Sequence, residues 1–252
     1  KAKKAVTTQV VDLTPALAGV LLERNPKNRR LSDLFVDNYA RDMEHGKWRF
    51  NGEPVIVADD GSLNDGQHRC AAVVQSGATI MTTLVIGVHR DSRTTLDQGR
   101  TRTIGDYLSM DGYVNTNQLG VAASFIWQHQ TRGYLANGGS GKPTKGEIMA
   151  MIEADTSIVQ SVNRMQVKGA PAYGGPSMLA FCHWTFWHAS TRELADEFMV
   201  KLIEGAGLMS RDPVLYLRNR MVSDRGRLRP NDKAELIFRS WNAWRRRETP
   251  KV

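Results

Sequence analysis

The feature that most constrains the fold of this 252-residue chain is a change in hydrophobic spacing at Gly66. Upstream, residues 55–57 form an apolar run rich in β-branched side chains, and Leu63 opens a second short strand after a turn signal. From Gly66 to Gly77 the apolar residues have helical spacing, and Gly77 is a suitable helix stop. Residues 79–88 indicate a further buried strand. This order predicts an α+β domain with a small mixed sheet.

The junction also carries the residues most suited to chemistry, Asp65 to Arg69. A helix N-terminus has unpaired N–H groups and partial positive charge, and Arg69 adds a forked cation suited to phosphate oxygens. Asp65 would repel such an anion unless it binds a divalent metal or takes part in acid–base chemistry. His68 fits a donor, a base or a supporting partner. The structural alternatives are a turn, a helix cap and a packed histidine.

Residues 61–77 resemble the signature of the ParB/sulfiredoxin superfamily, with an arginine-containing loop over 25–32 and a helix-like segment over 35–48 in the usual order before it. The resemblance covers roughly residues 8–90 and implies a small α/β nucleotide-binding fold. In that superfamily the segment matching Gly66 to Arg69 wraps the phosphates of CTP in partition proteins, or of ATP or ADP in sulfiredoxin and the free-serine kinase.

The resemblance makes four residues of the signature candidates for a phosphate cradle, with two more facing them from the first loop. They are Gly66, Gln67, His68 and Arg69, faced by Asn28 and Arg29. The implied ligand is a nucleoside triphosphate, CTP or ATP, with Mg²⁺ at Asp65. On this assignment, Arg69→Ala is expected to abolish nucleotide binding and leave the fold intact.

The sequence departs from the pattern of each characterised group of the superfamily, and these differences reduce the number of activities that the resemblance supports. Gln67 stands where sulfiredoxin has its reactive cysteine, and Cys70 follows the arginine instead, so peroxiredoxin repair is not expected of this chain. Asn28 stands where the serine kinase has a catalytic glutamate. The rest of the chain does not clearly supply the DNA-reading helix-turn-helix and dimerisation domain of partition proteins, which weakens a plain centromere-binding role.

Composition points to a polyanionic partner. The formal net charge is +8, which favours DNA or RNA, although a solvated cationic face is the alternative. Cys70 and Cys182 are too few for a disulfide framework or a four-cysteine zinc site, so both are expected to pack as small hydrophobes. No apolar stretch approaches the roughly eighteen residues of a membrane span, and no signal-peptide core follows the N-terminus, so a cytoplasmic location without membrane contact is expected.

A second basic segment follows the region of resemblance. Asp97, Arg100 and Arg102 flank a glycine turn, and the two arginines are candidates to contact phosphate. The alternative is a surface turn with an internal ion pair. Thr103 is then expected to cap a helix.

From residue 103 the chain has helical spacing, and Thr144 is expected to cap a helix over 145–154. Residues 178–190 hold rings on every side of one helix, which favours a buried core helix over a base-stacking platform. The histidines of this stretch lack local acidic partners for a metal site. The last helix has an apolar stripe, with arginines that are candidates to follow a nucleic-acid backbone, or else a solvated face: Arg239, Arg245, Arg246 and Arg247.

The sequence therefore predicts two domains, a ParB/sulfiredoxin-like nucleotide-binding domain over 1–102 and a helical domain over 103–252. The predicted function is nucleotide binding on or near DNA, with phosphoryl transfer, NTP hydrolysis or nucleotide-dependent DNA modification, in which Asp65 and His68 are the catalytic candidates. The partners expected for this chain are a nucleotide, DNA and a second copy of the chain in a homodimer. One alternative function is a non-enzymatic DNA-binding regulator or partition-type clamp that senses nucleotide. Another is a metal-dependent nuclease. The resemblance suggests a bacterial virus or mobile element as the source.

Overall fold

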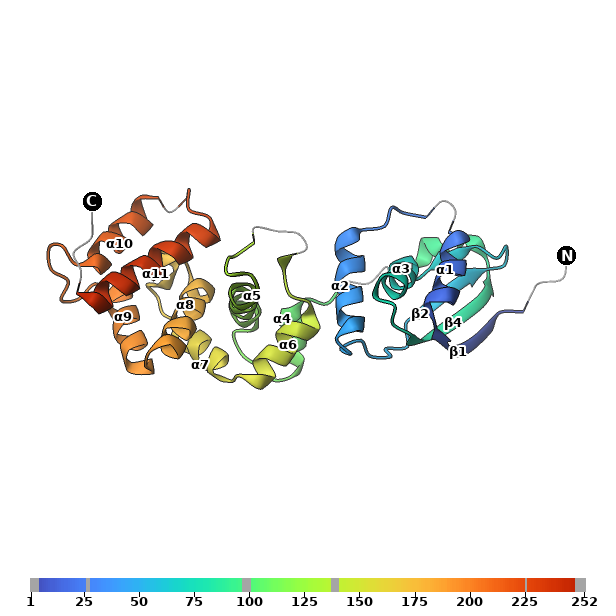
Figure 1. The fold of residues 1–252 in the computed structure, drawn as a ribbon, viewed down its shortest axis with the longest axis horizontal. Helices are drawn as coiled ribbons and strands as arrows, with labels where there is room; N and C mark the ends of the chain where they lie inside the picture. Colours follow the sequence, from blue (N-terminus) through green and yellow to red (C-terminus); the bar gives the residue numbers. More distant parts are fainter. Residues whose placement is uncertain (1–4, 26–27, 97–100, 137–140, 225, 248–252) are drawn as a thin grey trace. The chain divides into compact units, whose positions relative to one another are not determined.

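A computed structural model describes residues 5–25, 28–96, 101–136, 141–224 and 226–247 (Figure 1). The chain divides between Thr101 and Arg102 into two compact units. Each unit has its own hydrophobic core, one built from residues 13–84 and the other from residues 108–241. Across the described ranges, no helix is both long and apolar enough to cross a bilayer.

The first unit is a four-stranded mixed sheet with helices. Its elements are β1 (Thr7–Leu13), α1 (Pro15–Glu23), α2 (Asp33–Glu44), β2 (Pro54–Ala58), β3 (Leu63–Asp65), α3 (Gln67–Ser76), β4 (Ile80–Val88) and the 3₁₀ helix η1 (Arg90–Thr95). The strand order is β1-β4-β2-β3, in which β2 runs parallel to β4 and the other two neighbouring pairs are antiparallel. The α+β class and the small mixed sheet are confirmed.

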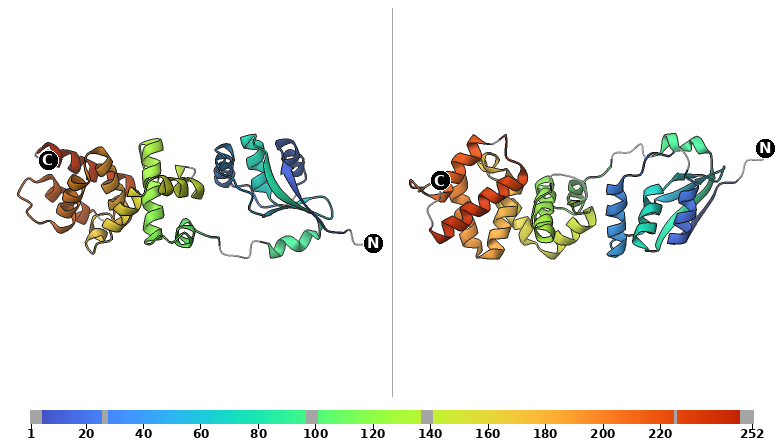
Figure 2. Two further views of the ribbon diagram at one scale, coloured as in Figure 1. Left: turned by 90° about the horizontal axis from the view of Figure 1, so that it is seen from below. Right: turned by 45° about the horizontal axis from the view of Figure 1, so that its top comes forward.

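Helices α1, α2 and α3 lie side by side against the sheet, with α3 in the middle (Figure 2). Thr14, followed by Pro15 in the first turn, has the sequence of an N-cap, and it caps α1 because its hydroxyl accepts from Leu17 N at 3.2 Å. The spacing of Leu17, Val20 and Leu21 predicts an inward stripe on this helix, and the prediction is wrong at Val20: its side chain is exposed, whereas Ala18 is fully buried. The buried face of α1 is therefore centred on Ala18 and Leu21, and Val20 lies outside it.

Strand β1 is an element that the sequence did not reveal. Only Leu13 of its seven residues is buried, and the strand pairs antiparallel with β4 at one edge of the sheet, where Leu13 lies opposite Ile80. An edge strand this exposed lacks the continuous apolar run that marks buried strands such as β2. The sheet is thus one strand wider than expected.

The second unit is helical in its described residues. Its α-helices are α4 (Ile104–Met110), α5 (Thr116–Arg132), α6 (Lys145–Ala154), α7 (Ser157–Arg164), α8 (Pro176–Ala189), α9 (Arg192–Glu204), α10 (Pro213–Ser223) and α11 (Pro230–Arg246), and a 3₁₀ helix, η3 (Ala170–Tyr173), precedes α8. The expected caps at Thr103 and Thr144 are both present as complete capping boxes, with Asp106 and Glu147 as the third helical residues.

Helix α8 forms the centre of this unit, as its ring-rich sequence predicted. It packs against α5, α7, α9 and α11, and most of its side chains are buried. Phe186 stacks on Trp241 of α11 with ring centroids 4.3 Å apart and nearly parallel planes. Such pairs add to the free energy gained by burying the rings. The aromatic residues are thus used for packing.

Candidate functional site

The strand–helix corner of the first unit requires glycine at position 66. Gly66 joins β3 to α3 with φ at +96°, a conformation that other L-residues rarely adopt. A Cβ built there would lie 2.9 Å from Cγ2 of Val55 on β2. Both backbone conformation and close packing therefore fix this residue.

Helix α3 begins without a side-chain cap. Gly66 is its N-cap residue and supplies no side chain to accept from the first-turn amides, which belong to Gln67, His68 and Arg69. Uncapped amides and the helix dipole make such a terminus favourable for an anion. The amides of the first turn of α3 thus have no acceptor from the side chain of the N-cap residue.

The segment between α1 and α2 is hydrogen-bonded onto the start of α3. Asn25 Nδ2 donates to Gln67 Oε1, and Gln67 Nε2 donates to the carbonyl of Arg29, both at 3.0 Å. Asn28 Nδ2 donates to Asn25 Oδ1 and to the Leu63 carbonyl. Gln67 is almost completely buried. Asn28 and Gln67 therefore hold the loop against α3 through side-chain amides, and Arg29 remains exposed.

His68 links the first turn of α3 to the start of α2. Its Nε2 accepts from the backbone N–H of Ser32, the N-cap residue of α2, at 3.1 Å. Burial lowers the pKa of His68, and the charge of Arg29 lowers it further against the opposing charge of Asp65. A neutral imidazole that accepts at Nε2 carries its proton on Nδ1, so His68 offers one N–H donor.

Arg69 is engaged by the protein itself. Its guanidinium donates to the carbonyls of Glu53 and Pro54 at 2.6 and 2.7 Å, and lies 3.4 Å from Asp65 Oδ2. The residue is 7% exposed. The fork expected to grip phosphate is thus directed at the start of β2, which makes Arg69 a residue that positions the corner.

Asp65 is partly exposed, with 30% of its side chain accessible. Within the described ranges, no group of three or more His, Cys, Asp or Glu residues is arranged to hold a metal ion. A single carboxylate does suit Mg²⁺ that arrives with phosphates, because that ion keeps several waters and needs only one or two protein carboxylates. Cys70 is buried beside the corner, and burial raises its thiol pKa to about 11, which argues against a nucleophilic role.

Two of the other basic candidates cannot be placed at this corner. Arg100 lies outside the described residues, and Arg102 is the first residue of the second unit, where its carbonyl accepts from Lys145 Nζ at 2.6 Å. Arg90 is a nearby cation that the sequence reasoning missed. It donates to the Leu63 carbonyl at 2.7 Å and to Asn64 Oδ1 at 3.1 Å. Its only sequence signal is its place directly after a predicted strand.

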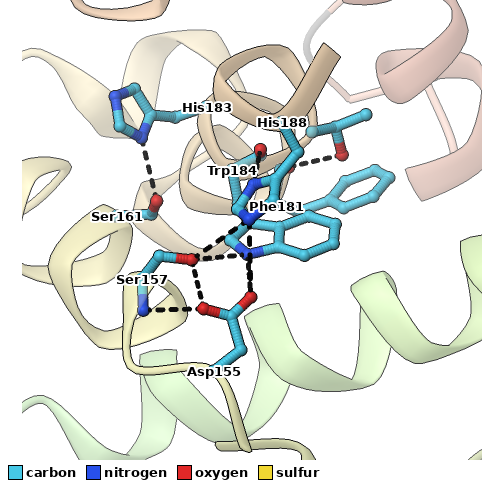
Figure 3. A network of polar contacts seen from close by, with 8 residues as sticks. Asp155, Ser157, Ser161, Phe181, His183, Trp184 and His188 are labelled. Carbon is cyan, nitrogen blue, oxygen red and sulfur yellow. Dashed lines mark hydrogen bonds and ion pairs between the residues drawn. The ribbon is translucent and has the colours of Figure 1, made fainter. Parts of the chain in front are cut away.

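The histidines of α8 have acidic partners that lie outside this helix. Figure 3 shows Asp155, which accepts from Trp184 Nε1 at 2.8 Å and lies 3.6 Å from His188 Nε2. Ser157 Oγ lies 3.5 Å from the same nitrogen, while His188 Nδ1 contacts the Trp184 carbonyl. A catalytic Ser-His-Asp relay uses opposite ring nitrogens for serine and aspartate. This cluster therefore secures the start of α7 against α8.

A second histidine of α8, His183, contacts a serine and an aspartate through its two different ring nitrogens. His183 contacts Ser161 Oγ through Nδ1 at 2.9 Å and Asp196 Oδ1 through Nε2 at 3.1 Å. Both Ser161 and His183 are 1% exposed, so no substrate reaches the hydroxyl. Burial lowers the pKa of His183 despite the charge of Asp196. The buried Ser161 and His183 and the partly exposed Asp196 thus form a polar link between α7, α8 and α9.

The candidate arginines of α11 differ in their surroundings. Arg239 pairs with Glu235 at 2.5 Å, and the guanidinium of Arg245 lies 5.4 Å from the centre of the Trp241 ring. Arg245, Arg246 and Arg247 are exposed. The neighbouring acid thus offsets the charge of Arg239, and the three consecutive arginines at the end of the helix form a basic group that a polyanion can reach.

Comparison with known proteins identified no relative. No protein-family model matches the chain, and neither does any curated protein or solved structure.

Proposed function

We propose that the first unit binds a nucleoside triphosphate, CTP or ATP, with its phosphates at the N-terminus of α3. The observation that carries the proposal is the start of α3 at Gly66 without a side-chain cap, beside an exposed Arg29 whose charge acts on His68. Backbone amides, a neutral imidazole donor and a guanidinium form a donor set suited to phosphate oxygens. The ParB/sulfiredoxin-like identity belongs to the same proposal.

The residues divide into two roles. One group of residues contacts the phosphates: Arg29, His68 through its Nδ1–H, and the backbone amides of the first turn of α3. Asn28, Gln67 and Arg69 hold the corner through their hydrogen bonds to the chain. Asp65, which precedes Gly66 and is partly exposed, is the group available to Mg²⁺.

The test is calorimetric titration of CTP, ATP and GTP with Mg²⁺ into the wild-type protein and into Arg29→Ala. Loss of a charge-assisted hydrogen bond weakens binding by about tenfold or more. Arg49→Ala is the matched control, because Arg49 is an exposed arginine of the same unit on the segment between α2 and β2. Absence of binding to the wild type, or equal affinity of the two variants, contradicts the phosphate site.

An assay of nucleotide turnover distinguishes an enzyme from a non-enzymatic protein that senses nucleotide. Release of inorganic phosphate, or transfer of a phosphoryl group, supports an enzyme in which Asp65 and His68 serve the reaction. Binding without turnover supports a regulator or clamp that senses nucleotide. Cleavage of supercoiled plasmid with Mg²⁺ would instead support a metal-dependent nuclease.

A second proposal is nucleic-acid binding by the second unit. Residues 102–252 hold 20 Lys and Arg against 14 Asp and Glu, which leaves a formal charge of +6 out of the total of +8. The accessible arginines at the end of α11 are the proposed backbone contacts, namely Arg245, Arg246 and Arg247. Their replacement by alanine should weaken DNA binding and reduce its salt dependence by about one counterion for each arginine that binds a phosphate, whereas Arg239→Ala should change it less because of the Glu235 ion pair.

A further inference from the structure

An exposed aromatic ring lies beside the proposed phosphate site. Phe35, in the first turn of α2, is 53% exposed. Its ring centroid lies 5.9 Å from that of His68, with the two planes at 76°. A lone exposed phenylalanine carries little meaning. Phe35 differs because its neighbour, His68, belongs to the first turn of α3.

The starts of α2 and α3 meet at His68. The imidazole accepts from the N–H of Ser32, and no side-chain hydrogen bond caps α2. Phe35 lies three residues after Ser32, and its other ring neighbour is Tyr39, one turn further along α2 at 6.4 Å. An exposed apolar ring is thus fixed next to the donors proposed for phosphate. A mononucleotide needs both kinds of surface, because its phosphates are anionic and its base has an apolar π face.

We infer that Phe35 stacks against the base of the nucleotide bound at α3. This inference rests on the proposed function and adds to it the part of the ligand that phosphate contacts do not recognise. A ring face accepts any base, so Phe35 supplies affinity for a nucleoside in preference to a bare polyphosphate, and discrimination between bases falls to other groups. The ligand class is therefore a nucleotide with an intact base.

The test compares two ligands and three variants. Wild type, Phe35→Leu and Phe50→Leu are titrated with the better-binding nucleoside triphosphate and, separately, with inorganic tripolyphosphate. Leucine keeps an apolar side chain and removes the π face. Phe50 is the matched control, because it is 48% exposed and lies in the same unit between α2 and β2. Phe35→Trp is added as a variant that retains an aromatic face.

Stacking predicts that Phe35→Leu weakens binding of the nucleoside triphosphate by about tenfold, within the range known for removal of one stacked ring. The same variant should bind tripolyphosphate like wild type, Phe50→Leu should leave both affinities unchanged, and Phe35→Trp should retain nucleotide affinity. Equal nucleotide affinity in Phe35→Leu and wild type overturns the stacking role and leaves the phosphate site standing. Equal weakening of both ligands also overturns it, because the ring would then support the phosphate contacts. Failure of wild type to bind either ligand overturns the proposed function itself.

Discussion

Among single residues, Gly66 has the strictest backbone and packing requirements at the corner between β3 and α3. Gly66→Ala would force alanine into a positive φ and place its Cβ 2.9 Å from Val55. Backbone strain and overpacking together should lower the free energy of unfolding by about 3 kcal/mol. Gly77→Ala is the control, since Gly77 also has a positive φ and nothing lies within 4 Å of its Cβ position. Urea unfolding should show a loss of about 1 kcal/mol there; equal losses at the two sites would remove the packing explanation.

Arg69 is the residue whose role changes most between sequence and structure. Its partners are the carbonyls of Glu53 and Pro54, so Arg69→Ala leaves two acceptors without their donor. We expect the first unit to lose about 3 kcal/mol of stability, in place of the intact fold that the resemblance implied. Trp48 is the only tryptophan before residue 102, which makes its fluorescence during urea unfolding the appropriate measurement. An unchanged midpoint together with a complete loss of nucleotide affinity would return Arg69 to the phosphate ligands.

The contacts of Arg69, compared with those predicted for it, show which features of a site can be inferred from sequence. Gly66, the start of α3 and the caps at Thr14, Thr103 and Thr144 were predictable, because each depends on residues within one turn. The partners of Arg69 come from a strand that starts 15 residues earlier, and no local pattern indicates which carbonyls it meets. The function of a charged side chain therefore depends on tertiary contacts that spacing does not encode.

Among the structural elements, α8 shows the same limit. Its ring-rich sequence was enough to predict a core helix, but Asp196, the partner of His183, lies on α9 and was not foreseen. Likewise β1 escaped prediction because an exposed edge strand has no apolar run. Burial of a whole helix leaves a dense pattern in the sequence, whereas a single polar contact between helices leaves none.

The link between α7, α8 and α9 should make the second unit sensitive to acid. His183 faces Ser161 and Asp196, with Arg164 and Arg192 nearby, and burial lowers its pKa below the usual 6.5. The unfolded chain then binds more protons than the folded one as pH falls below that value. Stability is therefore retained at neutral pH and lost as the pH falls from 6.5 through the folded pKa.

The measurement is urea unfolding between pH 7.5 and 5.0, followed by tryptophan fluorescence, which apart from Trp48 arises in the second unit. His183→Asn should be less stable at neutral pH, because asparagine does not reach both Ser161 and Asp196, and should show a smaller decline in acid. A decline as steep as that of wild type would assign the acid sensitivity to other groups, such as His129 on α5, since burial lowers its pKa as well.

At the scale of the whole molecule, the two units have separate cores and carry different proposed ligands. The hydrophobic cluster of residues 13–84 shares no member with that of residues 108–241. The net positive charge resides mainly in the second unit. Nucleotide and nucleic acid should therefore stabilise different parts of the chain.

Separate expression of residues 1–101 and 102–252 tests this division, with the full chain as the reference. Each piece should unfold cooperatively, because each retains a complete core. A nucleoside triphosphate at a hundredfold excess over its Kd should stabilise residues 1–101 by about 2.7 kcal/mol and raise their melting temperature by about 15 °C, and should leave residues 102–252 unchanged. Duplex DNA should bind the second piece alone. A first piece that folds only in the full chain would contradict the independence of its core. A nucleotide that stabilises the second piece would instead place the nucleotide site in that unit, because a ligand stabilises only the part of the chain that binds it.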